Sequence, residues 1–212
     1  MRRAIKVSAV ALAAVLALSG CSTDPLAEQY RSGGNQNYIA GDGTVLEIPA
    51  ANRDAPIEFT STTDAGKTVS AKDYLGKVLV VNFWAAYCDP CRFEAPNLEK
   101  LSQKHDDGAA EFLGVNIADT ADTSLAFARK YQVTYPSALD ADSGSVRLAF
   151  AGKTAQSALP TTLVLDTQGR VAARILGQLQ SASILDTIIE SVLAEKAVPA
   201  EKAVPAEKNK AQ

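Results

Sequence analysis

The sequence predicts an α/β fold in which helices flank a central mixed β-sheet, and three observations lead to this class. A near-continuous apolar run, 78–84, is typical of a buried central strand. Two further apolar runs, 161–165 and 171–176, flank a turn sequence and predict an antiparallel hairpin. The last segment, 181–193, spaces its apolar residues as an amphipathic helix does. Strands that alternate with helices and end in a hairpin and a helix form a layered α/β domain.

Shorter segments complete the predicted order of elements. The turn at 64–66 predicts a small hairpin before the central strand, and a helix follows that strand as far as His105. The remaining elements lie between this helix and the closing hairpin, and they are a strand at 111–117, a helix at 121–131, a loop or short strand near 136–140 and a short helix at 145–150.

Composition excludes some function classes. The chain has 212 residues, of which 47% are hydrophobic, enough for one ordinary domain with appendages. Its formal net charge of −3 argues against a nucleic-acid partner. Because His105 is the single histidine, a His-rich metal site is not expected, and we predict no metal or cofactor.

The N-terminus has the features of an export signal. Residues 1–20 combine basic residues near the start with an apolar core that is too short for a membrane span of about 20 residues. The sequence Leu18-Ser19-Gly20-Cys21 resembles a bacterial lipobox. That resemblance implies that Cys21 carries lipid and anchors the chain at the extracytoplasmic face of a bacterial cell membrane. The alternative is an ordinary secretory leader with a chance cysteine.

Composition also divides the rest of the chain. Residues 21–52 are polar and rich in Gly and Asn, which predicts a flexible tether. Residues 53–193 form the predicted domain. Residues 194–212 repeat a six-residue unit that contains proline and charged residues, and we predict that this tail is disordered.

Two cysteines at C-x-x-C spacing follow the central strand directly. Cys88 is expected at the N-terminus of the next helix, where unpaired backbone N–H groups and the helix dipole stabilise a thiolate. Pro90 suits the first helical turn because its missing N–H would have no helical partner there. A purely structural disulfide is the alternative, but so small a ring constrains little chain.

These cysteines belong to a longer pattern. Trp84, Cys88 and Cys91, with Leu159-Pro160 before the closing hairpin, resemble the thioredoxin superfamily, and residues 88–96 resemble its TlpA/ResA group of membrane-tethered thiol–disulfide oxidoreductases. The resemblance covers about residues 54–193. It implies a thioredoxin fold with an N-terminal hairpin and a central insertion that holds the 121–131 helix.

The resemblance also implies roles for individual residues. Cys88 would be the nucleophile and Cys91 the resolving thiol of a redox disulfide. Asp89 and Pro90 would tune the potential. The implied substrate-binding residues are Trp84, Leu159 and Pro160, with Pro160 in the cis form.

Glu94 is supported both by the resemblance and by helical spacing. Cys91, Glu94, Leu98 and Leu101 fall on one helix face, which the leucines make the buried one. Burial would raise the pKa of Glu94, and the carboxyl could exchange a proton with Cys91. Asn82 stands where cytoplasmic thioredoxins have a buried aspartate. Either Glu94 replaces that proton acceptor or Asn82 is simply a hydrogen-bonded structural residue.

The sequence therefore predicts a lipid-anchored thiol–disulfide oxidoreductase that acts on protein substrates outside the cytoplasm. The resemblance implies reduction of apocytochrome c cysteines, with a membrane thiol-transfer protein as electron donor. Three alternatives stay open, and these are a DsbA/DsbE-like oxidase, a peroxidase and a non-catalytic binding lipoprotein. The peroxidase is disfavoured because a Pro-x-x-x-Thr/Ser-x-x-Cys pattern is absent before Cys88.

Overall fold

A single eight-stranded mixed sheet forms the centre of the described part of the chain. The computed structural model describes residues 44–153 and 158–196. The strands, in chain order, are β1 (Val45–Glu47), β2 (Thr60–Thr63), β3 (Thr68–Ser70), β4 (Val78–Trp84), β5 (Ala110–Asn116), β6 (Ser137–Leu139), β7 (Thr161–Leu165) and β8 (Val171–Leu176). The helices are α3 (Asp89–Lys104), α4 (Ala121–Tyr131), α5 (Ser145–Ala149) and α6 (Ala182–Lys196), with 3-10 turns at Ala50–Asn52 and Ala71–Tyr74.

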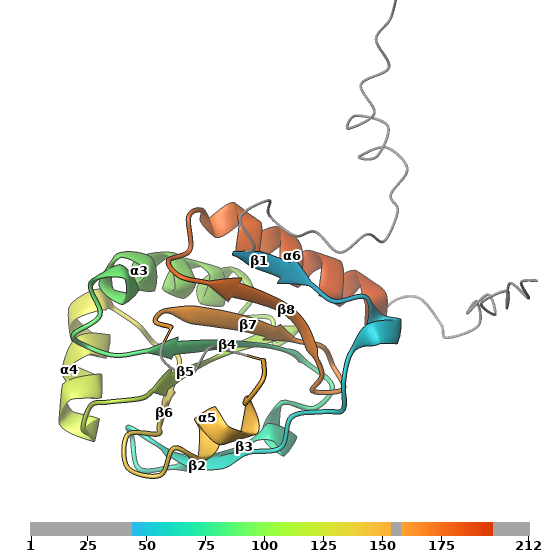
Figure 1. Ribbon diagram of the computed structural model, residues 1–212. Coiled ribbons are helices and arrows are strands. Elements are labelled where there is room, and N and C mark those ends of the chain that lie inside the picture. Colours follow the sequence, from blue (N-terminus) through green and yellow to red (C-terminus); the bar gives the residue numbers. More distant parts are fainter. Residues whose placement is uncertain (1–43, 154–157, 197–212) are drawn as a thin grey trace, which may run out of the picture. The chain divides into compact units, whose positions relative to one another are not determined.

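The order of the strands places β4 near the middle of the sheet. The order is β1-β8-β7-β4-β5-β6-β2-β3, in which β4, β5 and β6 run parallel and β7 pairs with β4 antiparallel. The segment between β5 and β7 holds α4, β6 and α5 (Figure 1). Because β4 is hydrogen-bonded to β5 on one side and to β7 on the other, the start of the loop that follows it is fixed by the sheet.

Alternate side chains of β4 enter two different cores. Val78 and Val80 pack with residues of α3 and α6, such as Leu98 and Ile189. Leu79 and Val81 face the other core, together with the first hairpin and α5. All seven residues of β4 are buried, so the apolar run reflects burial on both faces of the sheet.

The predicted boundaries are largely confirmed. β4, α4, β7 and β8 have the bounds that the sequence patterns predict, and β2 and β3 form the hairpin that is expected around the 64–66 turn. No helix within the described residues is long and apolar enough to cross a membrane.

Two predicted boundaries are wrong. Val45–Glu47, which we assigned to the tether, forms β1 and pairs with Ala173–Ile175 at the sheet edge. The last helix continues beyond residue 193 to Lys196, so the first residues assigned to the tail are helical. Both segments are short, and tertiary contacts rather than local pattern order them. The leader, Cys21 and residues 197–212 lie outside the described residues.

Candidate active site

The Cys88–Cys91 disulfide lies where β4 passes into α3. Cys88 is the N-cap of α3, and the two sulfurs are bonded at 2.07 Å. The backbone N–H of Cys91 donates to Cys88 Sγ at 3.2 Å. In the reduced form, this donor and the positive end of the α3 dipole favour a thiolate at Cys88. Cys88 is 7% exposed and Cys91 is 2% exposed, so Cys88 is the more accessible of the two residues.

A buried carboxyl lies one helical turn beyond Cys91. Glu94 is 1% exposed and shares the buried face of α3 with Leu98 and Leu101, as the spacing predicts. Burial raises its pKa to about 7, although hydrogen bonds from the Leu179 backbone N–H and the Asn82 side chain act to lower it. These bonds measure 2.9 and 2.8 Å. A carboxyl with this pKa can take up and release a proton near neutral pH.

Asn82 connects Glu94 to the sheet. Its Nδ2 group donates to Glu94 Oε1 and, at 3.1 Å, to Thr162 Oγ1 on β7. The amide is buried and cannot titrate, so among these residues the group that can exchange a proton is Glu94. Asn82 is thus a hydrogen-bonded residue that orients the carboxyl.

Trp84 supports the disulfide from the sheet side. Its indole packs at 4.2 Å between ring centroids against Phe127 of α4, and its Nε1–H donates to Ser137 Oγ at 3.2 Å. A side chain at Gly114 would place a Cβ atom 2.3 Å from Ser137 Oγ and 2.8 Å from Trp84 Nε1. Glycine is therefore required at position 114 by the close approach of this hydrogen-bonded pair.

The residues before β7 complete the same buried cluster. Trp84, Cys88, Cys91 and Phe127 pack together, and Leu159 packs against them. The Leu159–Pro160 peptide bond is cis, as the resemblance implies. The Pro160 carbonyl accepts from the Gly177 backbone N–H at 2.9 Å, which joins this segment to the end of β8.

The residues around the disulfide differ in exposure. Asp89 is exposed and pairs with Arg92 at 2.7 Å. Pro90 is the second residue of α3, where no hydrogen bond is lost. Tyr87, directly before Cys88, is 66% exposed, and Phe93 is 72% exposed. Both aromatic rings are available to a partner protein.

Asp119 is a site residue that the sequence analysis missed. It lies in the loop between β5 and α4, and its Oδ2 accepts the backbone N–H of Ala86 at 2.6 Å, two residues before Cys88. The sequence signal for it is its place three residues after the end of β5. Loops that follow neighbouring parallel strands meet at one edge of the sheet.

Comparisons with known proteins agree with this geometry. The AhpC/TSA family matches residues 51–174. The thiol:disulfide interchange protein HelX of Rhodobacter capsulatus is 38% identical over 157 residues, which cover 74% of this chain and 84% of HelX. The thiol-disulfide oxidoreductase ResA of Bacillus cereus is 29% identical over 126 residues, 59% of this chain and 69% of ResA.

A solved structure shares the architecture. The secreted thiol-disulfide isomerase of Corynebacterium glutamicum superposes with a TM-score of 0.64 and 27% identity, over 76% of this chain and 99% of that one. Together with the strand order, these matches establish the thioredoxin fold.

Proposed function

The chain belongs to the AhpC/TSA family and is a thiol–disulfide oxidoreductase, and from this premise we propose that Cys88 and Cys91 are its redox couple and that it reduces protein disulfides outside the cytoplasm. The observation that carries the proposal is the position of the Cys88–Cys91 disulfide at the N-terminus of α3, one turn from a buried carboxyl.

The reaction proceeds in two exchanges. The Cys88 thiolate attacks one sulfur of the substrate disulfide, which forms a mixed disulfide and releases the other substrate sulfur as a thiolate that takes up a proton. Cys91 then loses its proton and attacks the Cys88 sulfur, which closes the Cys88–Cys91 bond and releases the second substrate thiol. Two electrons pass from the dithiol to the substrate. Glu94 accepts the Cys91 proton, since its pKa of about 7 suits this transfer.

Two features support the direction of reduction. Ionised Glu94 places a negative charge one helical turn from Cys91, which disfavours a second thiolate there and so favours the disulfide over the dithiolate. The resemblance to the TlpA/ResA group further suggests apocytochrome c as a substrate and a membrane thiol-transfer protein as the electron donor. Trp84, Leu159 and Pro160 would contact the substrate, while Asp89 and Pro90 tune the potential.

We further propose that Cys21 is lipid-modified after removal of residues 1–20 and that the chain stays at the outer face of the membrane. The lipobox-like sequence supports this, and the relative from Corynebacterium glutamicum is described as secreted. Mass spectrometry of the chain from a bacterial membrane fraction should find a lipidated Cys21 as the first residue. An unmodified Cys21 would contradict the anchor.

The first test of the activity is the reduction potential of Cys88–Cys91. A full chain with Cys21→Ser, in graded glutathione buffers, would be followed by Trp84 fluorescence, because Trp84 packs in the cluster that holds both cysteines. We expect a value near that of thioredoxin, about −270 mV, or lower. A value near that of DsbA, about −120 mV, would indicate an oxidase instead. Cys88→Ala and Cys91→Ala variants should show no transition.

A peroxidase activity is tested separately, because the matching family is named for AhpC/TSA. The reduced chain should reduce the disulfides of a protein substrate, and it should consume hydrogen peroxide no faster than the Cys88→Ala variant. Rapid peroxide consumption that depends on Cys88 would replace the proposed function.

A further inference from the structure

The backbone of Ala86 is held on both sides by charged side chains. Ala86 lies in the turn between β4 and Cys88. Its N–H donates to Asp119 Oδ2 at 2.6 Å, and its carbonyl accepts from Arg92 Nε at 2.8 Å. One partner comes from the loop after β5 and the other from α3. A single peptide segment beside the nucleophile is thus bonded to two different elements.

Asp119 is itself fixed to the sheet. Asn116, the last residue of β5, is fully buried, and its Nδ2 group donates to Asp119 Oδ2 at 2.9 Å. Asn116 Oδ1 accepts the backbone N–H groups of Ala118 and Asp119 at 3.1 and 2.8 Å. Since Asn116 is paired with Trp84 in the parallel ladder, the carboxylate that holds Ala86 is anchored at the end of the same strand pair.

Arg92 is fixed to the helix in a comparable way. It follows Cys91 directly in α3, and its Nη1 group donates to Asp89 Oδ1 at 2.7 Å. This exposed ion pair contributes little energy on its own. It does hold the guanidinium so that Nε points at the Ala86 carbonyl. Ala86 is therefore tied to the residue next to Cys91 as well as to the sheet.

We propose that Asp119 and Arg92 are positioning residues that keep Cys88 close to Cys91 while the disulfide is open. The inference rests on the proposed function of this cysteine pair. In the oxidised form, the S–S bond fixes the loop. In the dithiol form, that constraint is gone, and the two bonds to Ala86 restrict the loop instead. A restricted loop gives the two thiols a high effective concentration toward each other.

The measurable quantity is the equilibrium between the dithiol and oxidised glutathione. One glutathione disulfide is reduced to two glutathione thiols while the protein dithiol becomes the Cys88–Cys91 disulfide. We expect Asp119→Ala and Arg92→Met each to lower this equilibrium constant by about tenfold, which raises the reduction potential by about 30 mV. Both changes free the same loop, so both shifts should have the same sign.

A conservative variant separates position from charge. In Asp119→Asn, the amide oxygen can still accept the Ala86 N–H, so the equilibrium constant should return to within about threefold of the wild type. If charge alone mattered, Asp119→Asn would behave like Asp119→Ala, and Arg92→Met would shift the potential in the opposite direction. Either result would overturn the proposal.

Helix α4 offers matched control substitutions. Asp122 and Arg129 are exposed and carry the same charges, and neither side chain bonds to the Ala86 turn among the described contacts. Asp122→Ala and Arg129→Met should leave the equilibrium unchanged. All variants would be made in the full chain with Cys21→Ser.

Failure of this inference can be told apart from failure of the proposed function. A wild-type dithiol that does not exchange with glutathione would refute the redox couple itself. A wild type that exchanges, with Asp119→Ala and Arg92→Met at the wild-type potential, would refute only the positioning role. Far-UV circular dichroism of the oxidised variants checks that each one is folded.

Discussion

Glu94, beside the disulfide, and Asp166, at the turn between β7 and β8, are both buried carboxyl groups, and their pKa values shift in opposite directions. Glu94 receives hydrogen bonds from an amide side chain and a backbone N–H, both of them neutral donors. These donors do not offset the cost of burying a charge, so its pKa rises to about 7.

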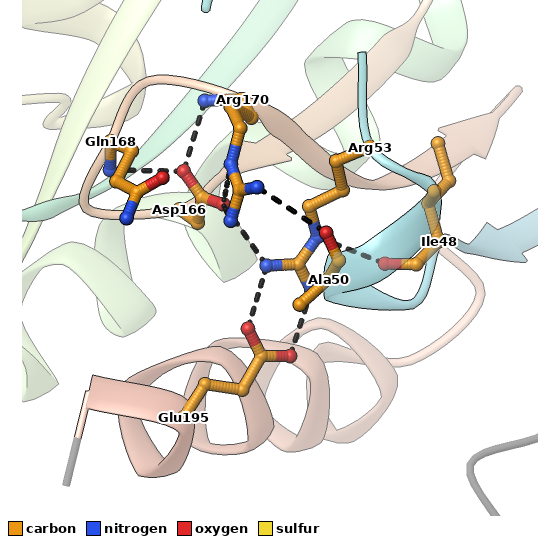
Figure 2. A network of polar contacts seen from close by, with 7 residues as sticks. All are labelled: Ile48, Ala50, Arg53, Asp166, Gln168, Arg170 and Glu195. Atoms are coloured by element: carbon orange, nitrogen blue, oxygen red, sulfur yellow. Dashed lines mark hydrogen bonds and ion pairs between the residues drawn. The ribbon is translucent and has the colours of Figure 1, made fainter. Parts of the chain in front are cut away.

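Asp166 is nearly as buried but has charged partners. Burial by itself would raise its pKa, yet hydrogen bonds from the backbone and side chain of Arg170 and from Arg53 lower it below the ordinary value of 3.8. Arg53 Nη1 lies 3.0 Å from Asp166, and the same guanidinium bonds Glu195 at 2.6 and 2.7 Å (Figure 2).

The two networks therefore serve different purposes. Through Arg53, the Asp166 network joins the segment before β2 to the β7–β8 turn and to the end of α6. Arg53 Nε also donates to the Ile48 carbonyl at 2.9 Å (Figure 2). This network is a structural link that stays charged at neutral pH. The Glu94 site lacks such a counter-charge among its described contacts, so its carboxyl can change protonation near neutral pH. A counter-charge makes the difference between a structural and a titrating carboxyl.

Removing one of the two counter-charges of Asp166 should have the largest effect on the free energy of unfolding. Arg53→Met leaves Asp166 buried with one arginine fewer, and the Arg53 side chain is only 2% exposed. We expect the free energy of unfolding to fall by about 3–5 kcal/mol, measured by urea denaturation of the oxidised protein. The Cys88–Cys91 potential should not move. A loss below about 1 kcal/mol would mean that the pair contributes as little as a surface ion pair.

Glu94→Gln should change how stability depends on pH. The folded chain holds the Glu94 proton up to about pH 7, whereas the unfolded chain releases it near 4.5. The folded state binds more protons between these values, so the free energy of unfolding falls as pH rises across this window, by about 3 kcal/mol. Urea denaturation at several pH values should show this decline in the wild type and not in Glu94→Gln.

The sign is opposite for Asp166. Its pKa is lowered on folding, so the stabilisation that it provides is present above pH 3.8 and is lost as pH falls through its folded pKa. Glu94→Gln should keep this loss in acid. If it abolished the acid loss instead, the two carboxyls would be coupled.

Asn82→Leu should have an intermediate effect. The variant removes a donor that lowers the Glu94 pKa, so that pKa should rise by about one unit. The inflection in the pH profile of disulfide reduction should move upward by the same amount. Thr162→Val is the control, because it removes an acceptor of Asn82 without contacting Glu94 in the described hydrogen bonds. An unchanged inflection in Asn82→Leu would mean that Glu94 does not control the rate.

Glu195→Gln should have the smallest effect on the free energy of unfolding. Glu195 is 39% exposed, and Arg53 keeps its bond to Asp166 when the charge of Glu195 is removed. We expect a loss of less than about 1 kcal/mol in the free energy of unfolding. A loss as large as that of Arg53→Met would show that the end of α6, rather than the Asp166 pair, depends on Arg53.

Much of the site was predictable because it lies within one short stretch. The C-x-x-C spacing and the helical spacing of Glu94 are local patterns, and both the disulfide and the burial of Glu94 agree with them. The roles of these residues in the reaction remain predictions. The contact of Asp119 with Ala86 joins residues that are far apart in sequence, because the pairing of β4 with β5 brings them together.

The sequence by itself determined the α/β class, most element boundaries, the cysteine pair and the buried face of α3, because each depends on neighbours within a few residues. Only the tertiary structure decided that β1 belongs to the sheet and that α6 extends to Lys196. It also decided that Asp166 meets Arg53 while Glu94 has neutral donors. Charge pairing and edge-strand pairing act between residues far apart in sequence, so no local sequence pattern predicts them.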